Sequence, residues 1–481
     1  MTRYSTFFFA WIGVLSLGSL AGAAYPIGII DQQAAAAHGL TRAWYSQIEM
    51  DGARGRVLHM VLAGGTLFVQ SDNAVLHALG AETGQTLWAQ RVGSAVHPTM
   101  PAAANADYVA VVNGSTLYLL NRFNGNLLWK KQVEHVPGAG PALSDRYVYV
   151  PMVNGLVAAY RLKPAEDPVA ELRKEQKVEL TDEQEKSAET ERQSGLRISQ
   201  ETSVALVCTS YGQVLVPPLV TSQGDLTENV TWTTSRGYLF VAQLDSEGGR
   251  FAANYRLETN GEITSEPAYL PANANVVGSS GVIFGASEDG FVYAVRETDG
   301  QLLWRFSTGE PIVEQTVVIG LRVLVPTQTG AMYCLDAKTG RELWSAPEIR
   351  RFLAASKDRI YVATKIGRVM VLNANTGARL DTLELTRLPV QMTNTQNDRL
   401  YVASPTGLVQ CLHEIGQTQP VFHRQVVAAG QKKAVEGEKA EESPPAAEQP
   451  AAEQPAAEKP AADNPFAAPP NAAPVADNPF N

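Results

Sequence analysis

Short runs of alternating hydrophobic and polar residues occupy most of the chain, and many occur in pairs around a glycine-containing turn. Four segments share this plan: residues 145–162, 281–297, 358–374 and 398–414. Period-2 alternation on both sides of such a turn is typical of a β-hairpin. The pattern therefore predicts a chain built mainly from antiparallel strands.

A turn followed by a tryptophan recurs between these hairpins. It reads DAKTGRELW at residues 336–344; close copies lie at 80–88, 121–129, 296–304 and 373–381, and a degraded copy at 243–252. An Asp or Asn at the first position can accept hydrogen bonds from backbone N–H groups of the turn, and a Gly at the fifth position takes a positive φ. Along the chain the tryptophan position is occupied by Trp88, Trp129, Ala252, Trp304, Trp344 and Asp381.

Each unit of about 40 residues therefore contains four short strands, which is the signature of a β-propeller blade. The recurring turn joins the third strand to the outer fourth strand, and the tryptophan is large enough to pack against the adjacent blade. The predicted blade-docking residues are Trp88, Trp129, Trp304 and Trp344, with the turn glycines Gly84, Gly125, Gly300 and Gly340.

The number of first strands gives the number of blades. First strands are expected to start near Val57, Val96, Ala139, Val214, Ile263, Ile312, Arg350 and Leu388. The count predicts an all-β, eight-bladed propeller, with seven blades as the alternative.

The two ends of the repeat region predict how the ring closes. The last unit has only three strands of its own, and residues 40–49 resemble a fourth strand without a blade. Pairing this N-terminal strand with the last blade removes an exposed sheet edge. Closure by residues 420–427 is the less favoured alternative.

The first 24 residues have the features of a secretory signal peptide. Arg3 precedes an uncharged run from Ser5 to Ala24 that ends in small residues, as an A-x-A cleavage site requires. An uncleaved anchor is the alternative, because the run is nearly long enough to span a bilayer. Residues 25–39 are then a linker to the propeller, which we place at residues 40–427.

Two further segments break the strand pattern. Residues 163–201 hold 11 acids and 7 bases, with a capping box at Thr181 and Gln184, and predict a charged helical insertion or, alternatively, a flexible loop.

Residues 428–481 predict a disordered tail, because 15 Ala and 10 Pro in residues 431–481 leave little apolar surface to bury. This tail contains DNPF twice, at 463–466 and 477–480. A Phe in such a segment can anchor a short-motif interaction, and repeat slippage is the simpler interpretation.

Charge is concentrated in those two segments. The net charge of −10 includes −4 from residues 163–201 and −5 from residues 431–481, where 9 acids face 4 bases, so about −1 is left for everything else. No basic surface for nucleic acid is expected.

Candidate chemistry is sparse. Cys334 and Cys411 precede turns at a position where other copies carry Ala, so we expect buried free thiols. The seven His residues have no metal-ligand spacing, and no phosphate loop or nucleophile motif occurs.

Four charged residues are candidates for lining the central channel, because they fall on or near predicted innermost strands: Glu266, Glu314, Arg350 and Arg351. A solvated polar channel is the alternative.

The repeat resembles the PQQ-like (quinoprotein alcohol dehydrogenase-like) β-propeller family, which includes PQQ-dependent dehydrogenases and the outer-membrane assembly factor BamB. The docking pattern of that family, Ala-x-Asp-x-x-Thr-Gly-x-x-x-Trp, is matched by Ala78, Thr83, Gly84 and Trp88, by Asp336, Thr339, Gly340 and Trp344, and in part by Ala294, Gly300 and Trp304. Members that use PQQ carry two adjacent cysteines, whereas the cysteines here, at 208, 334 and 411, are never adjacent. The resemblance therefore implies the fold over residues 40–427 and favours a member without PQQ.

These features predict an exported, non-catalytic propeller that serves as a BamB-like protein-interaction scaffold in the periplasm or cell envelope of a bacterium. Its expected partners are proteins, without a cofactor or metal and without a transmembrane domain once the signal is cleaved. Peripheral membrane association is compatible with this prediction. The alternatives are a PQQ-dependent oxidoreductase and a ligand-binding or sensor propeller.

Overall fold

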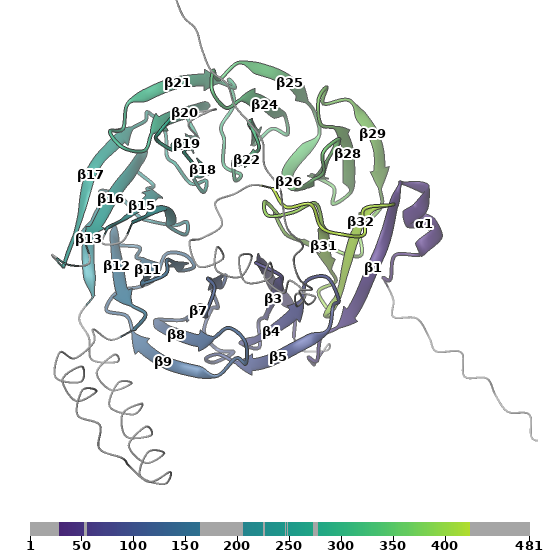
Figure 1. Cartoon of the computed structure of the whole chain (residues 1–481), viewed down its shortest axis with the longest axis horizontal. Coiled ribbons are helices and arrows are strands. Elements are labelled where there is room, and N and C mark those ends of the chain that lie inside the picture. Colours follow the sequence, from purple (N-terminus) through teal and green to yellow (C-terminus); the bar gives the residue numbers. More distant parts are fainter. Residues whose placement is uncertain are drawn as a thin grey trace, which may run out of the picture. The chain divides into compact units, whose positions relative to one another are not determined.

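Eight antiparallel sheets of four strands each surround a central axis in a computed structural model of the chain (Figure 1). The structure describes residues 28–51, 55–163, 205–224, 227–245, 247, 249–272 and 278–423. The predicted eight-bladed all-β propeller is confirmed, and the alternative of seven blades is wrong. The predicted signal peptide (1–24), nearly all of the insertion (163–201) and the tail (428–481) lie outside the described residues.

The first four blades follow one another along the chain, innermost strand first. Blade 1 consists of β2 (Val57–Ala63), β3 (Thr66–Ser71), β4 (Val75–Gly80) and β5 (Thr86–Arg91). Blade 2 consists of β6 (Ala103–Ala104), β7 (Tyr108–Asn113), β8 (Thr116–Asn121) and β9 (Leu127–Gln132). Blade 3 consists of β10 (Ala142–Leu143), β11 (Tyr147–Pro151), β12 (Leu156–Arg161) and β13 (Leu206–Thr209). Blade 4 consists of β14 (Leu219–Gln223), β15 (Thr227–Thr233), β16 (Tyr238–Asp245) and β17 (Arg250–Glu258).

The last four blades have the same order, except that the outer strand of blade 8 comes from the N-terminal side. Blade 5 consists of β18 (Ala268–Leu270), β19 (Val282–Ala286), β20 (Phe291–Arg296) and β21 (Leu302–Ser307). Blade 6 consists of β22 (Val317–Ile319), β23 (Arg322–Pro326), β24 (Met332–Asp336) and β25 (Glu342–Ala346). Blade 7 consists of β26 (Ile349–Ala355), β27 (Arg359–Thr364), β28 (Val369–Asn373) and β29 (Arg379–Leu383). Blade 8 consists of β30 (Val390–Gln391), β31 (Leu400–Ala403), β32 (Leu408–Glu414) and β1 (Leu40–Gln47).

The core lies between the blades. Second strands such as β3 and β11 are buried at every position, because each blade is covered by a neighbour on both faces. Outer strands such as β5 are mostly exposed, and in β5 only Trp88 is buried. The expected first-strand starts Val57 and Arg350 fall within one residue of a strand start, whereas Val214, Ile263 and Ile312 come five residues too early. Those three residues are buried, because the links into the first strands already pack between blades before the ladder begins.

The ring closes through the N-terminal strand, as predicted. β1 pairs antiparallel with β32 from Leu40↔Glu414 to Gln47↔Leu408 and completes the four strands of blade 8 (Figure 1). The alternative closure by residues 420–427 is wrong for the part that is described, since Phe422 forms only an isolated bridge with Asn397. Within the predicted linker 25–39, Gln32–Ala37 form the helix α1, capped by the Asp31 carboxylate.

A buried arginine ties blade 8 to blade 1 near this closure. The Arg399 side chain has no exposed surface, and its Nε lies 3.2 Å from the Glu82 carboxylate. Its two Nη atoms donate to the carbonyl oxygens of Gln417 and Thr418, at 2.9 and 2.8 Å. The guanidinium therefore joins blade 8, the turn of blade 1 and the segment after β32.

The docking tryptophans reach from the outer strands of five blades to the turn of the next blade. Each indole Nε1 donates to a backbone carbonyl there: Trp44 to Ala81 (2.9 Å), Trp88 to Arg122 (2.8 Å), Trp129 to Leu162 (3.2 Å), Trp304 to Ala337 (3.0 Å) and Trp344 to Ala374 (3.1 Å). The ring also covers the turn glycine. A Cβ on Gly340 would lie 2.5 Å from the Trp304 ring, so only glycine fits this turn, where φ is +68°.

Blade 4 uses a tyrosine that the sequence pattern did not identify. The pattern placed the docking position of this blade at Ala252, but Tyr255 is paired with Val241 as Trp304 is paired with Ala294. The Tyr255 ring covers Gly300, and its hydroxyl donates to the carbonyl of Glu297 at 2.7 Å. Trp44 was also missing from the predicted docking residues.

Glutamates reinforce the three seams that lack a docking tryptophan, and two of them, Glu228 and Glu297, are buried. Between blades 3 and 4, Glu228 accepts from Tyr149 Oη at 2.6 Å and from Arg146 Nε at 2.9 Å. The other two seams use the same chemistry: between blades 4 and 5 Glu297 accepts from Thr221 Oγ1 at 2.7 Å, and between blades 7 and 8 Glu414 accepts from Ser356 Oγ at 2.6 Å and Tyr361 Oη at 2.9 Å. Burial and the neighbouring carboxylates raise the pKa of Tyr149 and of Tyr361, so both hydroxyls stay protonated as donors.

The seam between blades 7 and 8 has a second polar contact in place of tryptophan. Asp381 occupies the docking register of blade 7, opposite Val371, and its Oδ2 lies 2.6 Å from His38 Nδ1. The His38–Gly39 turn after α1 takes the place of a docking turn, with Arg359 Nη1 donating to the His38 carbonyl at 3.4 Å. Partial burial alone would raise the pKa of Asp381, but the hydrogen bonds from His38 and from the Thr382 amide outweigh it and lower the pKa.

We expect Trp344→Ala to lower the free energy of unfolding by about 3–5 kcal/mol, because it removes a buried aromatic side chain and its hydrogen bond. The measurement is chemical denaturation, with exposed Leu343→Ala in the same strand as the matched control. An unchanged stability together with a lost binding activity would contradict the architectural role of this residue.

For the polar seams, Glu228→Ala is expected to cost about 3 kcal/mol, because it removes the buried carboxylate that accepts hydrogen bonds from Arg146 and Tyr149. Glu342→Ala, on the exposed side of β25, is the control and should change stability little. Thermal unfolding of the two variants tests this, and equal melting temperatures would refute a stabilising role for the buried carboxylate.

Stability at the seam between blades 7 and 8 should depend on acid pH. Since the pKa of Asp381 is lower in the folded state, its contribution is complete above the unfolded value of about 4 and is lost as the pH falls through the folded value. Asp381→Asn should therefore melt at a lower temperature than the unsubstituted protein at pH 6, and the difference should shrink below about pH 4. Exposed Asp358→Asn is the control, and a difference that does not change with pH would count against the His38–Asp381 pair.

Candidate interaction face

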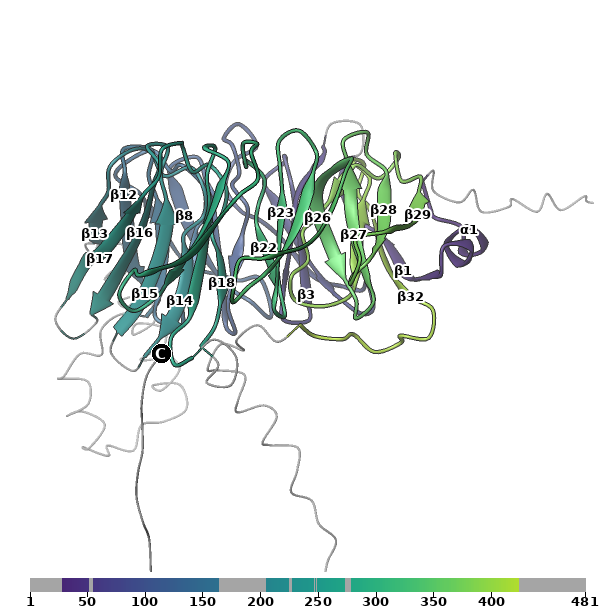
Figure 2. The same cartoon turned by 90° about the horizontal axis from the view of Figure 1, so that it is seen from above.

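The up-and-down order of strands gives the propeller two different faces. One face, here called the hairpin face, carries the turns between second and third strands and the links from each outer strand to the next innermost strand. The opposite face, the motif face, carries the docking turns and the turns between first and second strands. Figure 2 shows the ring edge-on, with the strands running between these two faces.

Three of the predicted channel residues join neighbouring blades, each near the start of an innermost strand. Arg350 Nε lies 3.3 Å from Glu314 Oε1 and links blades 7 and 6. Arg351 Nη2 donates to the Gln391 carbonyl of blade 8 at 2.6 Å, and burial, followed by the charge of Arg350, lowers the pKa of Arg351. The structure thus brings Glu314, Arg350 and Arg351 to one side of the hairpin face.

Glu266, the fourth predicted channel residue, belongs to a different contact. Its Oε2 accepts from Gln315 Nε2 at 2.7 Å, which links blades 5 and 6, and burial raises the pKa of its carboxyl. That these four side chains line the central channel stays a prediction.

The links on the hairpin face expose apolar side chains in one half of the ring. Val96, in the link from blade 1 to blade 2, is 87% exposed, and Val136, in the next link, is 68% exposed. Leu215 and Tyr211 in the link to blade 4 and Leu58 at the start of blade 1 are also exposed. Among the described residues, the links into blades 5–8 hold no exposed Val, Leu, Ile, Phe, Tyr, Trp or Met. The apolar half of the hairpin face is therefore the half over blades 1–4, whose links expose apolar side chains. The half over blades 5–8 carries Glu314, Arg350 and Arg351, and it exposes Ile366 in the turn between β27 and β28.

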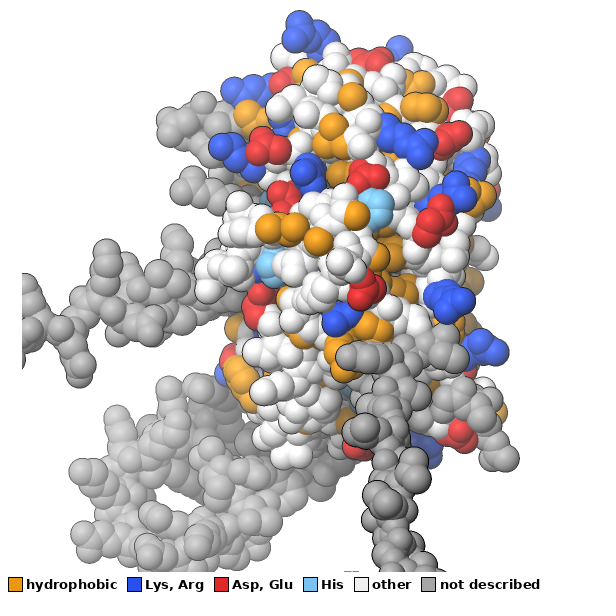
Figure 3. Space-filling model, turned by 90° about the vertical axis from the view of Figure 1, so that its right-hand side faces the viewer, with side chains coloured by type: hydrophobic (Ala, Val, Ile, Leu, Met, Phe, Trp, Pro, Cys, Tyr) orange, Lys and Arg blue, Asp and Glu red, His pale blue; other side chains and the backbone are white. Residues whose placement is uncertain are grey.

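The outer rim differs from this face. Around α1, β1 and β29 the surface carries acidic, basic and apolar side chains in a mixed pattern (Figure 3). Exposed leucines such as Leu343 and Leu380 are spread over separate outer strands of the ring. Scattered apolar side chains of this kind are normal for a protein surface.

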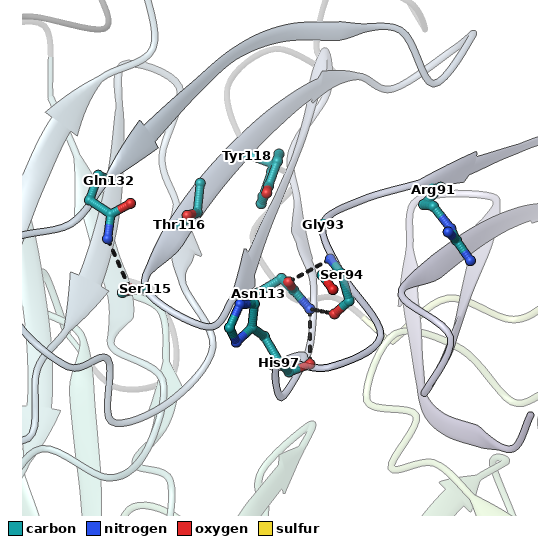
Figure 4. Close-up of a pocket in the computed structure, with 9 residues that line it drawn as sticks. All are labelled: Arg91, Gly93, Ser94, His97, Asn113, Ser115, Thr116, Tyr118 and Gln132. Atoms are coloured by element: carbon teal, nitrogen blue, oxygen red, sulfur yellow. Dashed lines mark hydrogen bonds between the residues drawn. The ribbon is translucent and has the colours of Figure 1, made fainter.

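A polar pocket of about 640 Å³ lies beside the apolar links of blades 1 and 2 (Figure 4). It is lined by Arg91, Gly93, Ser94, His97, Asn113, Ser115, Thr116, Tyr118 and Gln132. The lining has cationic and neutral hydrogen-bonding groups and no carboxylate, so it suits a ligand that offers hydrogen-bond acceptors.

Asn113 holds the wall of this pocket. Its Nδ2 donates to the carbonyls of Ser94 and His97 at 3.1 Å and to Thr99 Oγ1 at 2.8 Å, and its Oδ1 accepts from the Ser94 amide at 2.9 Å. The bonds fix the link in place (Figure 4). Because the amide is fully engaged in the link, Asn113 positions the pocket and is not itself free to bind a ligand.

Neither a metal-binding cluster nor an exposed thiol occurs among the described residues. No group of three His, Cys, Asp or Glu side chains among them is placed to hold a metal ion. Cys208, Cys334 and Cys411 are buried and unpaired, as expected, and burial raises the pKa of all three thiols. In this part of the chain no helix is long and apolar enough to cross a membrane.

The propeller is similar to solved structures of several functions. BamB from Moraxella catarrhalis aligns with a TM-score of 0.55 at 14% identity, over 78% of this chain and 98% of that chain. The quinohemoprotein alcohol dehydrogenase ADHIIG from Pseudomonas putida HK5 aligns with a TM-score of 0.51 at 12% identity, over 79% and 76%. The C-terminal WD40 domain of Sif2 gives 0.52 at 12% identity, over 78% and 99%. At these identities the likeness establishes the fold alone.

A comparison with curated proteins finds no match. A family profile described as outer membrane protein assembly factor BamB matches residues 33–235 and 232–440, which is the propeller with its insertion. The matched range includes the recurring turns, the docking tryptophans and the closing strand β1. The chain therefore belongs to the PQQ-like propeller family that this BamB profile describes.

Proposed function

We propose that this protein is an exported, non-catalytic scaffold of a bacterial cell envelope that binds a protein partner through the apolar half of its hairpin face. The observation that carries the proposal is the repeated exposure of apolar side chains at equivalent links, with Val96 at 87% and Val136 at 68%. Isolated exposed residues need no explanation, but a set gathered on one face is typical of an interaction site.

Family membership supports the envelope location and the scaffold role. The matching profile and the M. catarrhalis structure both carry the name of an outer-membrane assembly factor. The other half of the same face carries Glu314, Arg350 and Arg351, which place charge beside the apolar links. Protein–protein interfaces usually combine an apolar part with polar and charged residues next to it.

The absence of adjacent cysteines from the sequence supports a non-catalytic role. The quinoprotein dehydrogenase alternative rests on similarity of fold, which many functions share. Incubation of the purified protein with PQQ and calcium is expected to give no dye-linked alcohol oxidation above background. Substantial turnover would refute the non-catalytic part of the proposal.

The binding face is tested by placing a photo-crosslinking amino acid at Val96 or Val136 in full-length protein expressed in its native envelope. We expect a discrete cross-linked partner, identified by mass spectrometry, and at least a tenfold lower yield at either site when Leu58 and Leu215 are both replaced by Asp. Val207→Asp with Val421→Asp is the matched control, because both valines are about half exposed (50% and 47%) but lie outside the hairpin-face links. A cross-link that survives the Leu58→Asp and Leu215→Asp pair, or its absence from both probe sites, would refute this face as the binding site.

A further inference from the structure

The polar pocket of the hairpin face lies between side chains of two neighbouring blades (Figure 4). Blade 1 contributes Arg91 at the end of β5, and the link into blade 2 contributes Ser94 and His97. Blade 2 contributes side chains from the turn between β7 and β8, from β8 and from the end of β9: Ser115, Thr116, Tyr118 and Gln132. Tyr118 also packs against the apolar cluster between blades 1 and 2. The pocket therefore occupies the hairpin-face end of this seam.

The link on one side of the pocket is held in a fixed position. Asn113 is 2% exposed, and its amide bonds to three points of the link. A Cβ on Gly93, where φ is +95°, would overlap Asn113 Oδ1, so only glycine allows the link to approach this amide so closely. A ligand therefore meets a wall that is already ordered, which reduces the entropy lost on binding.

The pocket offers more hydrogen-bond donors than acceptors. Ser94 Oγ accepts from the Val96 amide at 3.3 Å, and Ser115 Oγ accepts from Gln132 Nε2 at 3.0 Å. Because each oxygen is used as an acceptor, its hydroxyl hydrogen can be donated to a ligand. The Arg91 guanidinium, which has donors only, forms no hydrogen bond or ion pair with the described residues. Such a lining is complementary to a negatively charged group with acceptor oxygens.

No acidic side chain in the lining competes with such a ligand. Glu134, in the link that follows β9, acts on Lys131 and Tyr160 at the seam between blades 2 and 3. Asp72, in the turn before β4, accepts from the Arg56 amide at 2.7 Å. The charge of the lining is therefore positive, and it favours an anionic occupant.

The exposed valine of the same link indicates what carries the negative charge. Val96 lies between Ser94 and His97 in sequence and is 87% exposed. An apolar side chain beside a donor-rich pocket fits a protein segment in which an acidic residue has an apolar neighbour. The volume of about 640 Å³ is within the range of pockets that hold a ligand, roughly 300–1,000 Å³. The pocket therefore admits an acidic side chain with its adjoining backbone.

We propose that this pocket receives an Asp or Glu side chain of the protein partner, while an apolar residue of the same partner segment packs on Val96. The proposal rests on the proposed function, because it requires a partner on the hairpin face. The carboxylate pairs with Arg91, and the hydroxyls of Ser94 and Ser115 donate to oxygen atoms of the same segment. Charge pairs at an interface mainly determine orientation and specificity. The pocket would thus orient the partner on the apolar links.

An amine placed in the pocket detects the carboxylate directly. A carbodiimide joins an amine to a carboxylate that is in contact with it, so full-length Arg91→Lys protein in its native envelope should form an amide with an acidic residue of the partner. Mass spectrometry identifies both linked residues. Arg379→Lys is the matched control, because Arg379 is also an exposed arginine on an outer strand and has no partner among the described residues. No amide to this partner is expected at residue 379.

A photo-crosslinking amino acid at Val136, in the next link, reports separately whether the partner is bound. Arg91→Glu should lower the cross-link yield at Val136 about tenfold, because it places two negative charges against each other. Arg91→Gln should lower the yield less, and Arg379→Glu should leave it unchanged. Circular dichroism and the melting temperature confirm that each variant is folded.

The outcomes separate this proposal from the proposed function. A partner that cross-links at Val136 but forms no amide at residue 91, or whose yield is unchanged by Arg91→Glu, would overturn the proposal and leave the proposed function standing. No cross-link at either Val96 or Val136 would refute both. An amide to a small carboxylic acid, or to an acid of this chain or of a second copy, would also overturn the proposal, because it assigns a different occupant to the pocket.

Discussion

Closure of the ring is the constraint on which the other contacts depend. A blade buries both faces only when it has a neighbour on each side, and second strands such as β3 and β11 are buried at every position. The pairing of β1 with β32 gives blade 8 its outer strand, and Trp44 on that strand docks on the turn of blade 1. Arg399 adds a charged contact to Glu82 across the same seam. Without this closure, two blades would each expose a buried face to water.

Two chemistries hold the seams of the ring, and they place different demands on the chain. At a seam with a docking tryptophan, stability comes from buried apolar area and one hydrogen bond. Such a seam also requires a glycine beneath the ring, as at Gly340. A glutamate seam requires all partners of a desolvated carboxylate to be in position at once, as Tyr149 and Arg146 are around Glu228. The glutamates occur where the tryptophan is replaced by Leu206, Tyr255 or Asp381. Stability is therefore distributed around the ring over two kinds of contact, and neither kind occurs at every seam.

The sequence predicted the fold well because the docking turn is a local feature. Asp336, Gly340 and Trp344 lie within nine residues, so turn chemistry and spacing are visible together. Tyr255 was missed because the degraded turn of blade 4 hid the strand register, and Trp44 because α1 replaces the docking turn before it. Glu228 and Tyr149 are 79 residues apart, and nothing local connects them.

The candidate binding face was harder to predict for a related reason. Val96 and Val214 occupy links of the same kind, yet Val96 is 87% exposed and Val214 is fully buried. Both are valines that the sequence pattern placed at the start of a first strand, and the packing of the neighbouring blade separates them. Glu314 and Arg350 were both candidates from the sequence, but their ion pair follows from the approach of blades 6 and 7.

The pairing of Leu40 with Glu414 also sets an order of events during synthesis. The strand that completes the last blade is translated first, and its partner follows 374 positions later. Contacts between residues so distant in sequence form late, because closing so long a loop costs conformational entropy before the contacts can stabilise the structure. Seven blades can form while both edges of β1 are still unpaired. Unpaired strand edges are the parts of a nascent sheet that pair with incorrect partners. Assembly of this protein is therefore most vulnerable in the interval just before its final strand pair forms.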